Sequence, residues 1–156
     1  DTIPGFLQTG IYPTKKCVGT ISNAMDVGNS SNFVRIMESF QQQVPELKKK
    51  LTAYSINDDE TKATLKAVLD KYQYLLDPHG DVGYNALEQY LITHPSEKGI
   101  VVETAHPVKS YDVVEPLIEQ DISLPAIIQQ QSKLEKKARM IENEILQLRN
   151  FLSSLT

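Results

Sequence analysis

The segment that best combines reactive side chains with a structural pattern is residues 99–109. Its apolar, β-branched start at residues 99–102 is typical of a short buried strand, and Pro107 would end any ladder pairing. Between them, Glu103, Thr104 and His106 place a carboxylate, a hydroxyl and an imidazole just past the strand. Because open α/β sheets bind ligands at strand ends, the pattern predicts a ligand site here.

Two further segments carry polar side chains next to apolar runs. Residues 22–28 follow a predicted strand and offer donors and an acceptor at Ser22, Asn23 and Asp26. These side chains could contact a polar ligand, or they could form a hydrogen-bonded turn that only shapes the floor of a pocket. Both interpretations remain open.

The other segment, residues 77–84, begins with Asp77, Pro78 and His79 before a predicted helix. Asp77 can fix the turn around Pro78, so we assign Asp77, His79 and His106 to the architecture of a pocket. A metal site built from these three residues is not predicted, because no i, i+4 or Cys/His ligand spacing is present.

Composition narrows the class of protein. The chain has 156 residues, of which 40% are hydrophobic and 23% charged, as expected for a soluble globular domain with a core. No apolar run reaches the length of about 18 residues that a membrane span needs. The net charge of −4 argues against a nucleic-acid partner. The single cysteine, Cys17, excludes an internal disulfide and indicates a reducing compartment such as the cytoplasm.

Hydrophobic spacing predicts helices separated by short strands. We expect strands at residues 17–21, 51–56 and 99–102, and a Pro/Gly-punctuated loop at residues 1–10. A helix capped by Ser30 or Ser31 should continue toward Pro45. A second helix is expected after the capping-box pair Asn57 and Glu60, and its apolar face would carry Leu65, Val68, Leu69 and Tyr72. A third helix should follow Asp77 and end before Pro95. Beyond Lys109 the chain should again be helical, with Ser123 as cap and Pro125 at the first helical position. This order is typical of an α/β domain.

Apolar residues in the C-terminal tail recur at alternating spacings of four and three, as in about three coiled-coil heptads. Two interpretations are open: a coiled-coil dimer, or a terminal helix whose apolar stripe packs on the chain's own body. We favour the second, because three heptads is only the lower limit for a coiled coil. The residues of the stripe are Leu134, Ala138, Ile141, Ile145, Leu148, Leu152 and Leu155.

Together, residues 22–28, 77–84 and 104–109 closely resemble threonine synthase, in the order in which that family carries them. The resemblance implies an enzyme of threonine biosynthesis, a lyase that uses pyridoxal 5'-phosphate to convert O-phospho-L-homoserine and water to L-threonine and phosphate. It also implies a tryptophan synthase β-like fold, the three-layer α/β sandwich of fold type II. Residues 1–121 would be the helix-rich C-terminal part of the catalytic domain, and residues 122–156 a helical tail packing on it.

The same resemblance implies roles for individual residues. Thr104 would be the hydroxyl partner of the cofactor's ring nitrogen, although a threonine at a strand end commonly satisfies a local backbone group instead. Ser22, Asn23 and Asp26 would line the substrate pocket. A neutral hydroxyl partner draws less charge onto the ring than an aspartate would.

Two parts that such chemistry needs are not found in this sequence. No lysine lies in a family-like Ser-Phe-Lys-Asp setting, and there is no Gly-rich loop for the cofactor phosphate. The chain also opens on Asp1. We therefore expect a C-terminal part of the enzyme, inactive alone, with the Schiff-base lysine in the N-terminal part. Two alternatives are another fold type II lyase or synthase, and a non-catalytic α/β module that associates through its heptad tail.

Overall fold

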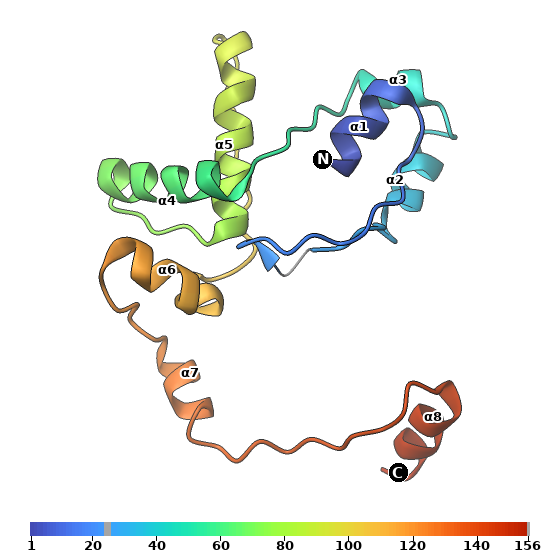
Figure 1. Cartoon of the computed structure of the whole chain (residues 1–156), viewed down its shortest axis with the longest axis vertical. Coiled ribbons are helices and arrows are strands. Elements are labelled where there is room, and N and C mark those ends of the chain that lie inside the picture. Colours follow the sequence, from blue (N-terminus) through green and yellow to red (C-terminus); the bar gives the residue numbers. More distant parts are fainter. Residues whose placement is uncertain (24–25, 156) are drawn as a thin grey trace. The chain divides into compact units, whose positions relative to one another are not determined.

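A computed structural model describes residues 1–23 and 26–155, which form mainly helices (Figure 1). The chain divides into two compact units, Asp1–Ser123 and Leu124–Thr156. The first unit contains α1 (Thr2–Thr9), α2 (Phe33–Ser39), α3 (Val44–Lys48), α4 (Asp58–Tyr72), α5 (Pro78–Thr93), the 3-10 helix η2 (Pro107–Ser110) and α6 (Tyr111–Ile118); the second contains α7 (Ala126–Gln131) and α8 (Ile145–Ser153). None of the described helices is long and apolar enough to cross a membrane.

The loop expected at residues 1–10 is wrong, because α1 occupies it. Pro4 lies in the first turn, where its missing N–H breaks no helical hydrogen bond. Phe6 is buried against Phe33, with ring centroids 4.9 Å apart, and Tyr12 stacks on Phe33 at 5.0 Å. Gly10 ends the helix at a φ of 75°, a left-handed conformation that suits glycine. The burial of aromatic surface therefore overrides the local loop signals.

The helix expected to run toward Pro45 is divided in two. It begins at Phe33 after Asn32, rather than after Ser30 or Ser31, and ends at Ser39. Gln41 and Gln42 then take φ values of 51° and 60°, which a continuous α-helix does not allow. A new short helix, α3, follows, with Pro45 in its first turn.

The capping box at the start of α4 is confirmed. The Asn57 side chain accepts from the Asp59 and Glu60 N–H groups, and the Glu60 carboxylate accepts from the Asn57 N–H at 2.8 Å. α4 packs against both α5 and α6 (Figure 1). Leu65 and Val68 are buried in this packing, whereas Tyr72, expected on the same face, is 52% exposed.

None of the three expected strands forms within the part of the chain that the structure describes, where residues 17–20, 51–56 and 99–102 have no regular secondary structure. Their β-branched residues favour extended backbone, yet a strand also needs a neighbour for its N–H and C=O groups. The helix-rich character of the expected fold is therefore seen, and its sheet layer is not.

The second unit departs from the heptad expectation. α8 begins only at Ile145, and residues 135–144 are not helical. A short helix gains little stability unless its apolar face packs against other elements, so periodicity alone does not extend it. Pro125 is extended, with ψ 143°, and forms the N-cap of α7, so that helix begins one residue later than predicted and Ser123 does not cap it.

Candidate functional site

The first turn of α5 organises the most buried polar group of side chains. Asp77 is the N-cap and is fully buried; its Oδ1 accepts the Gly80 N–H at 2.9 Å. Its Oδ2 lies 2.7 Å from His79 Nδ1. Pro78 takes the first helical position, where it has no N–H to leave unpaired. Asp77 thus holds the helix start and the imidazole at once.

Glu103 joins the segment that precedes Thr104 to this helix start. Its Oε1 accepts the Asp77 N–H at 3.0 Å. The fit is tight at Gly80, where a Cβ would lie 2.9 Å from that same oxygen. Sequence reasoning missed both roles, because Glu103 and Gly80 are 23 residues apart and no local pattern links them.

Three carboxyl groups therefore crowd around the first turn of α5. Burial, together with the charges of Glu103 and Asp77, raises the pKa of Asp81 to about 8, and neither carboxyl oxygen of Asp81 has a hydrogen-bond partner among the described residues. Burial also raises the pKa of Glu103. Burial acts in the same sense on Asp77, but the hydrogen bonds from Gly80 and His79 outweigh it and lower the pKa of that carboxyl.

A cavity of about 550 Å³ lies beside this cluster. Glu103, Thr104 and His106 all line it, so the structure brings together the polar residues that follow residues 99–102. The Thr104 side chain is exposed and makes no hydrogen bond among the described residues, so the local backbone bond that offered an alternative role is not formed. His106 Nδ1 accepts the Val108 N–H at 3.1 Å and caps η2. The remaining lining residues are Tyr74, Leu75, Ala105, Pro107, Ile122 and Ser123.

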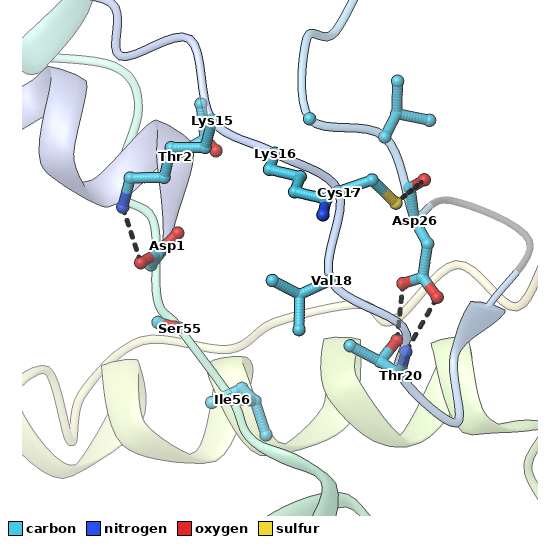
Figure 2. A pocket seen from close by; sticks show the side chains of 12 residues that line it. Asp1, Thr2, Lys15, Lys16, Cys17, Val18, Thr20, Asp26, Ser55 and Ile56 are labelled. Atoms are coloured by element: carbon cyan, nitrogen blue, oxygen red, sulfur yellow. Dashed lines mark hydrogen bonds and ion pairs between the residues drawn. The ribbon is translucent and has the colours of Figure 1, made fainter.

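The loop that carries Asp26 borders a different pocket, of about 370 Å³ (Figure 2). Thr20 donates to both Asp26 oxygens, from its N–H at 2.8 Å and its hydroxyl at 2.7 Å, and the Cys17 thiol donates to the Asp26 carbonyl at 2.6 Å. The Thr20 hydroxyl bond, followed by the Thr20 N–H bond, lowers the pKa of the Asp26 carboxyl. Asp26 therefore shapes its own loop.

The neighbouring members of this loop are Ser22 and Asn23. The Ser22 hydroxyl lies 3.1 Å from that of Thr20, and the Asn23 carbonyl accepts the Asp26 N–H at 3.2 Å. Both side chains are at the surface or half-buried. The two residues that follow in the quoted motif, Ala24 and Met25, lie outside the described residues.

One contact anchors this loop to the helical part of the unit. The Ile21 N–H donates to Asp58 Oδ1 at 3.2 Å, at the start of α4. The charge of His79 adds a smaller lowering of the Asp26 pKa, so the loop is within electrostatic reach of the α5 start. Ser22, Asn23 and Asp26 do not line the Thr104 cavity in the described structure. No cluster of three metal-ligating side chains is found among the residues described.

Comparison with known proteins gives a consistent result, although no protein-family model matches the chain. The threonine synthase of Buchnera aphidicola subsp. Schizaphis graminum is 38% identical over 97% of the chain, and the chain spans 34% of its length. The crystal structure of threonine synthase from Escherichia coli matches all of the chain with a TM-score of 0.83 and 31% identity, over 36% of that protein. A threonine synthase from Brucella melitensis, solved with PLP bound, matches 99% of the chain with a TM-score of 0.71 and 25% identity, over 38% of its own length. This chain is therefore homologous to threonine synthases along nearly its whole length and spans about a third of theirs.

Proposed function

We propose that this chain is the C-terminal part of a PLP-dependent threonine synthase, which converts O-phospho-L-homoserine and water to L-threonine and phosphate. The observation that carries the proposal is the match of the whole chain to threonine synthase structures, one of which holds PLP. The exposed free cysteine, Cys17, is compatible with a reducing cytoplasmic location. We expect no membrane or nucleic-acid partner.

The Thr104 cavity suits one edge of the cofactor. Its wall presents a hydroxyl that is not engaged by the chain's own backbone, next to the Glu103 and His106 side chains. The Thr104 hydroxyl would donate a hydrogen bond to the ring nitrogen of the cofactor, because that nitrogen needs a hydrogen-bond partner in a site without water. When bound, PLP supplies an electron-withdrawing ring that stabilises negative charge on the substrate carbon. None of the described lysines lines this cavity, so the covalent attachment would come from the rest of the protein.

The loop containing Asp26 is our candidate for the substrate side. Because Thr20 already engages both Asp26 oxygens, Asp26 would hold the loop in shape. Ser22 and Asn23 would then offer the hydroxyl and amide that bind the polar groups of phosphohomoserine. The two bonds from Thr20 to Asp26 support this division of roles.

Residues 99–103 expose apolar side chains, and this exposure supports the sheet layer that we expected. Ile100 and Val102 are 90% and 76% exposed, whereas the alternate residues face α5. A strand with one apolar face uncovered and free backbone edges is incomplete alone. We infer that strands of the remaining two-thirds of the protein pair with this segment to build the three-layer sandwich.

The test uses the complete protein, supplied with PLP and O-phospho-L-homoserine. Formation of L-threonine with equimolar phosphate is expected, and the 156-residue chain alone should form none. Cofactor binding with turnover of other amino acids, but not of phosphohomoserine, would instead indicate another fold type II lyase or synthase. A complete protein without a cofactor absorption band would indicate a non-catalytic module.

A further inference from the structure

We propose that Glu103 is a positioning residue that holds Thr104 in place by tying its segment to the first turn of α5, and that Gly80 is required for this contact. The effect on activity rests on the proposed function of Thr104. The contact between Glu103 and the first turn of α5, which we call the tie, is a property of the fold and can be measured without activity.

The segment lies along α5 with alternate residues turned toward the helix. A Cβ at Gly99 would fall on the Leu87 side chain, and one at Gly83 would lie 3.6 Å from Val101 Cγ1. These contacts are apolar or between small groups, so they supply little directional restraint. They keep the segment against the helix without fixing its exact position.

Glu103 supplies the directional contact. The Asp77 N–H donates to Glu103 Oε1 at 3.0 Å, and this hydrogen bond joins residues 99–105 to the N-cap of α5. The bond is part-buried, and because a hydrogen bond needs a defined distance and angle it restricts where Glu103 can lie. The same Asp77 holds Gly80 and His79, so the tie ends in a rigid helix start.

Thr104 is covalently next to this tie and lines the same cavity as Glu103. A displacement of the Glu103 backbone therefore moves the Thr104 hydroxyl. In a site that needs a hydrogen bond of defined length, a shift of about 1 Å can cost on the order of a hundredfold in rate. Two substitutions distinguish the effect of side-chain length from that of charge. Glu103→Asp keeps the charge but shortens the side chain, whereas Glu103→Gln keeps the length but removes the charge.

The experiment compares Glu103→Asp, Glu103→Gln and Gly80→Ala in the complete protein. Amide hydrogen exchange at Asp77 and at residues 101–105 reports the tie directly. We expect exchange to rise about tenfold in Glu103→Asp and in Gly80→Ala, and to stay within about threefold of wild type in Glu103→Gln. Glu97→Gln is the matched control, because Glu97 accepts a hydrogen bond from the Tyr90 hydroxyl at 2.9 Å and lies outside this cluster.

A second comparison tests the contact at Gly80. Since Gly80 is crowded by the Glu103 carboxylate, Gly80→Ala should have a large effect in the wild-type background and little effect in a Glu103→Ala background. Equal effects in both backgrounds would contradict the role of Gly80. Wild-type exchange in Glu103→Asp, or Glu103→Gln resembling Glu103→Asp, would overturn the role of side-chain reach.

Activity adds a separate readout. With the tie weakened, Glu103→Asp should lower kcat and shift the cofactor absorption band, whereas Glu103→Gln should retain most of both. If the wild-type protein makes no threonine, the proposed function fails, but the exchange pattern still decides whether Glu103 is the tie. If exchange changes as expected while kcat and the absorption band do not, the tie does not position Thr104.

Discussion

Replacing Asp81 with asparagine tests the electrostatics of the α5 start directly. Asp81 is fully buried and its carboxyl oxygens have no hydrogen-bond partner in the part of the chain that the structure describes, so its ionised form is poorly solvated. Asparagine has nearly the same shape and stays neutral at every pH. The Asp81→Asn variant therefore removes the cost of ionisation and leaves the packing in place.

The pKa of Asp81 sets the expected magnitude. It rises from 3.8 to about 8 on folding, so the folded state holds the proton more tightly than the unfolded state. This proton contributes stability that is fully present below about pH 4 and is lost as the pH rises toward 8. At about 1.4 kcal/mol per pH unit, the loss is roughly 4 kcal/mol at pH 7. This value is an upper bound, because local opening lets water reach the carboxylate.

Urea unfolding followed by circular dichroism at 222 nm, at pH 5, 6, 7 and 8, measures the free energy of unfolding. Wild type should lose stability across this range, and Asp81→Asn should be flatter and more stable, by up to about 4 kcal/mol at pH 7. Asp59→Asn is the control, since that side chain is 96% exposed on α4. Parallel pH profiles for wild type and Asp81→Asn would refute the reasoning.

Three other substitutions test separate parts of the structure. In the complete protein, Thr104→Val should slow threonine formation roughly tenfold to a hundredfold. Thr104→Ser should keep most of the activity because the hydroxyl remains. A fully active valine variant would exclude the role of that hydroxyl. Asn57→Ala removes the capping box of α4 and should lower the free energy of unfolding by about 1 kcal/mol in urea titrations, whereas an unchanged midpoint would mean that the cap contributes nothing. Gly28→Ala places a Cβ in contact with the Lys15 carbonyl, so protease cleavage near residues 15–28 should accelerate, and an unchanged cleavage rate would show that the loop adapts.

Local signals in the sequence predicted α4 and α5 well. The capping box of Asn57 and Glu60 and the Asp77–Pro78 start of α5 each depend on residues within one turn, and both are formed as expected. Thr104 and His106 also come together at one cavity, because they follow the same extended segment.

Features that depend on distant contacts were not predictable in the same way. α1 forms because Phe6 meets Phe33, 27 residues away in sequence, despite the local turn signals at Pro4 and Gly5. The approach of Glu103 to Gly80 and the burial of Asp81 require the path of the chain after α5 to be known. For the expected strands, β-branched residues favour an extended backbone, but the pattern could not show which segment would pair with them.

The alternate contacts of residues 99–103 with α5 have a consequence for register. Gly99, Val101 and Glu103 face the helix, so a slip by one residue would turn Ile100 and Val102 inward and Glu103 outward. A slip by two residues would separate Glu103 from the Asp77 N–H. The position of Thr104 is thus set by contacts along α5 rather than by the length of the exposed connection at residues 94–98. Insertions in that connection should therefore leave Thr104 in place.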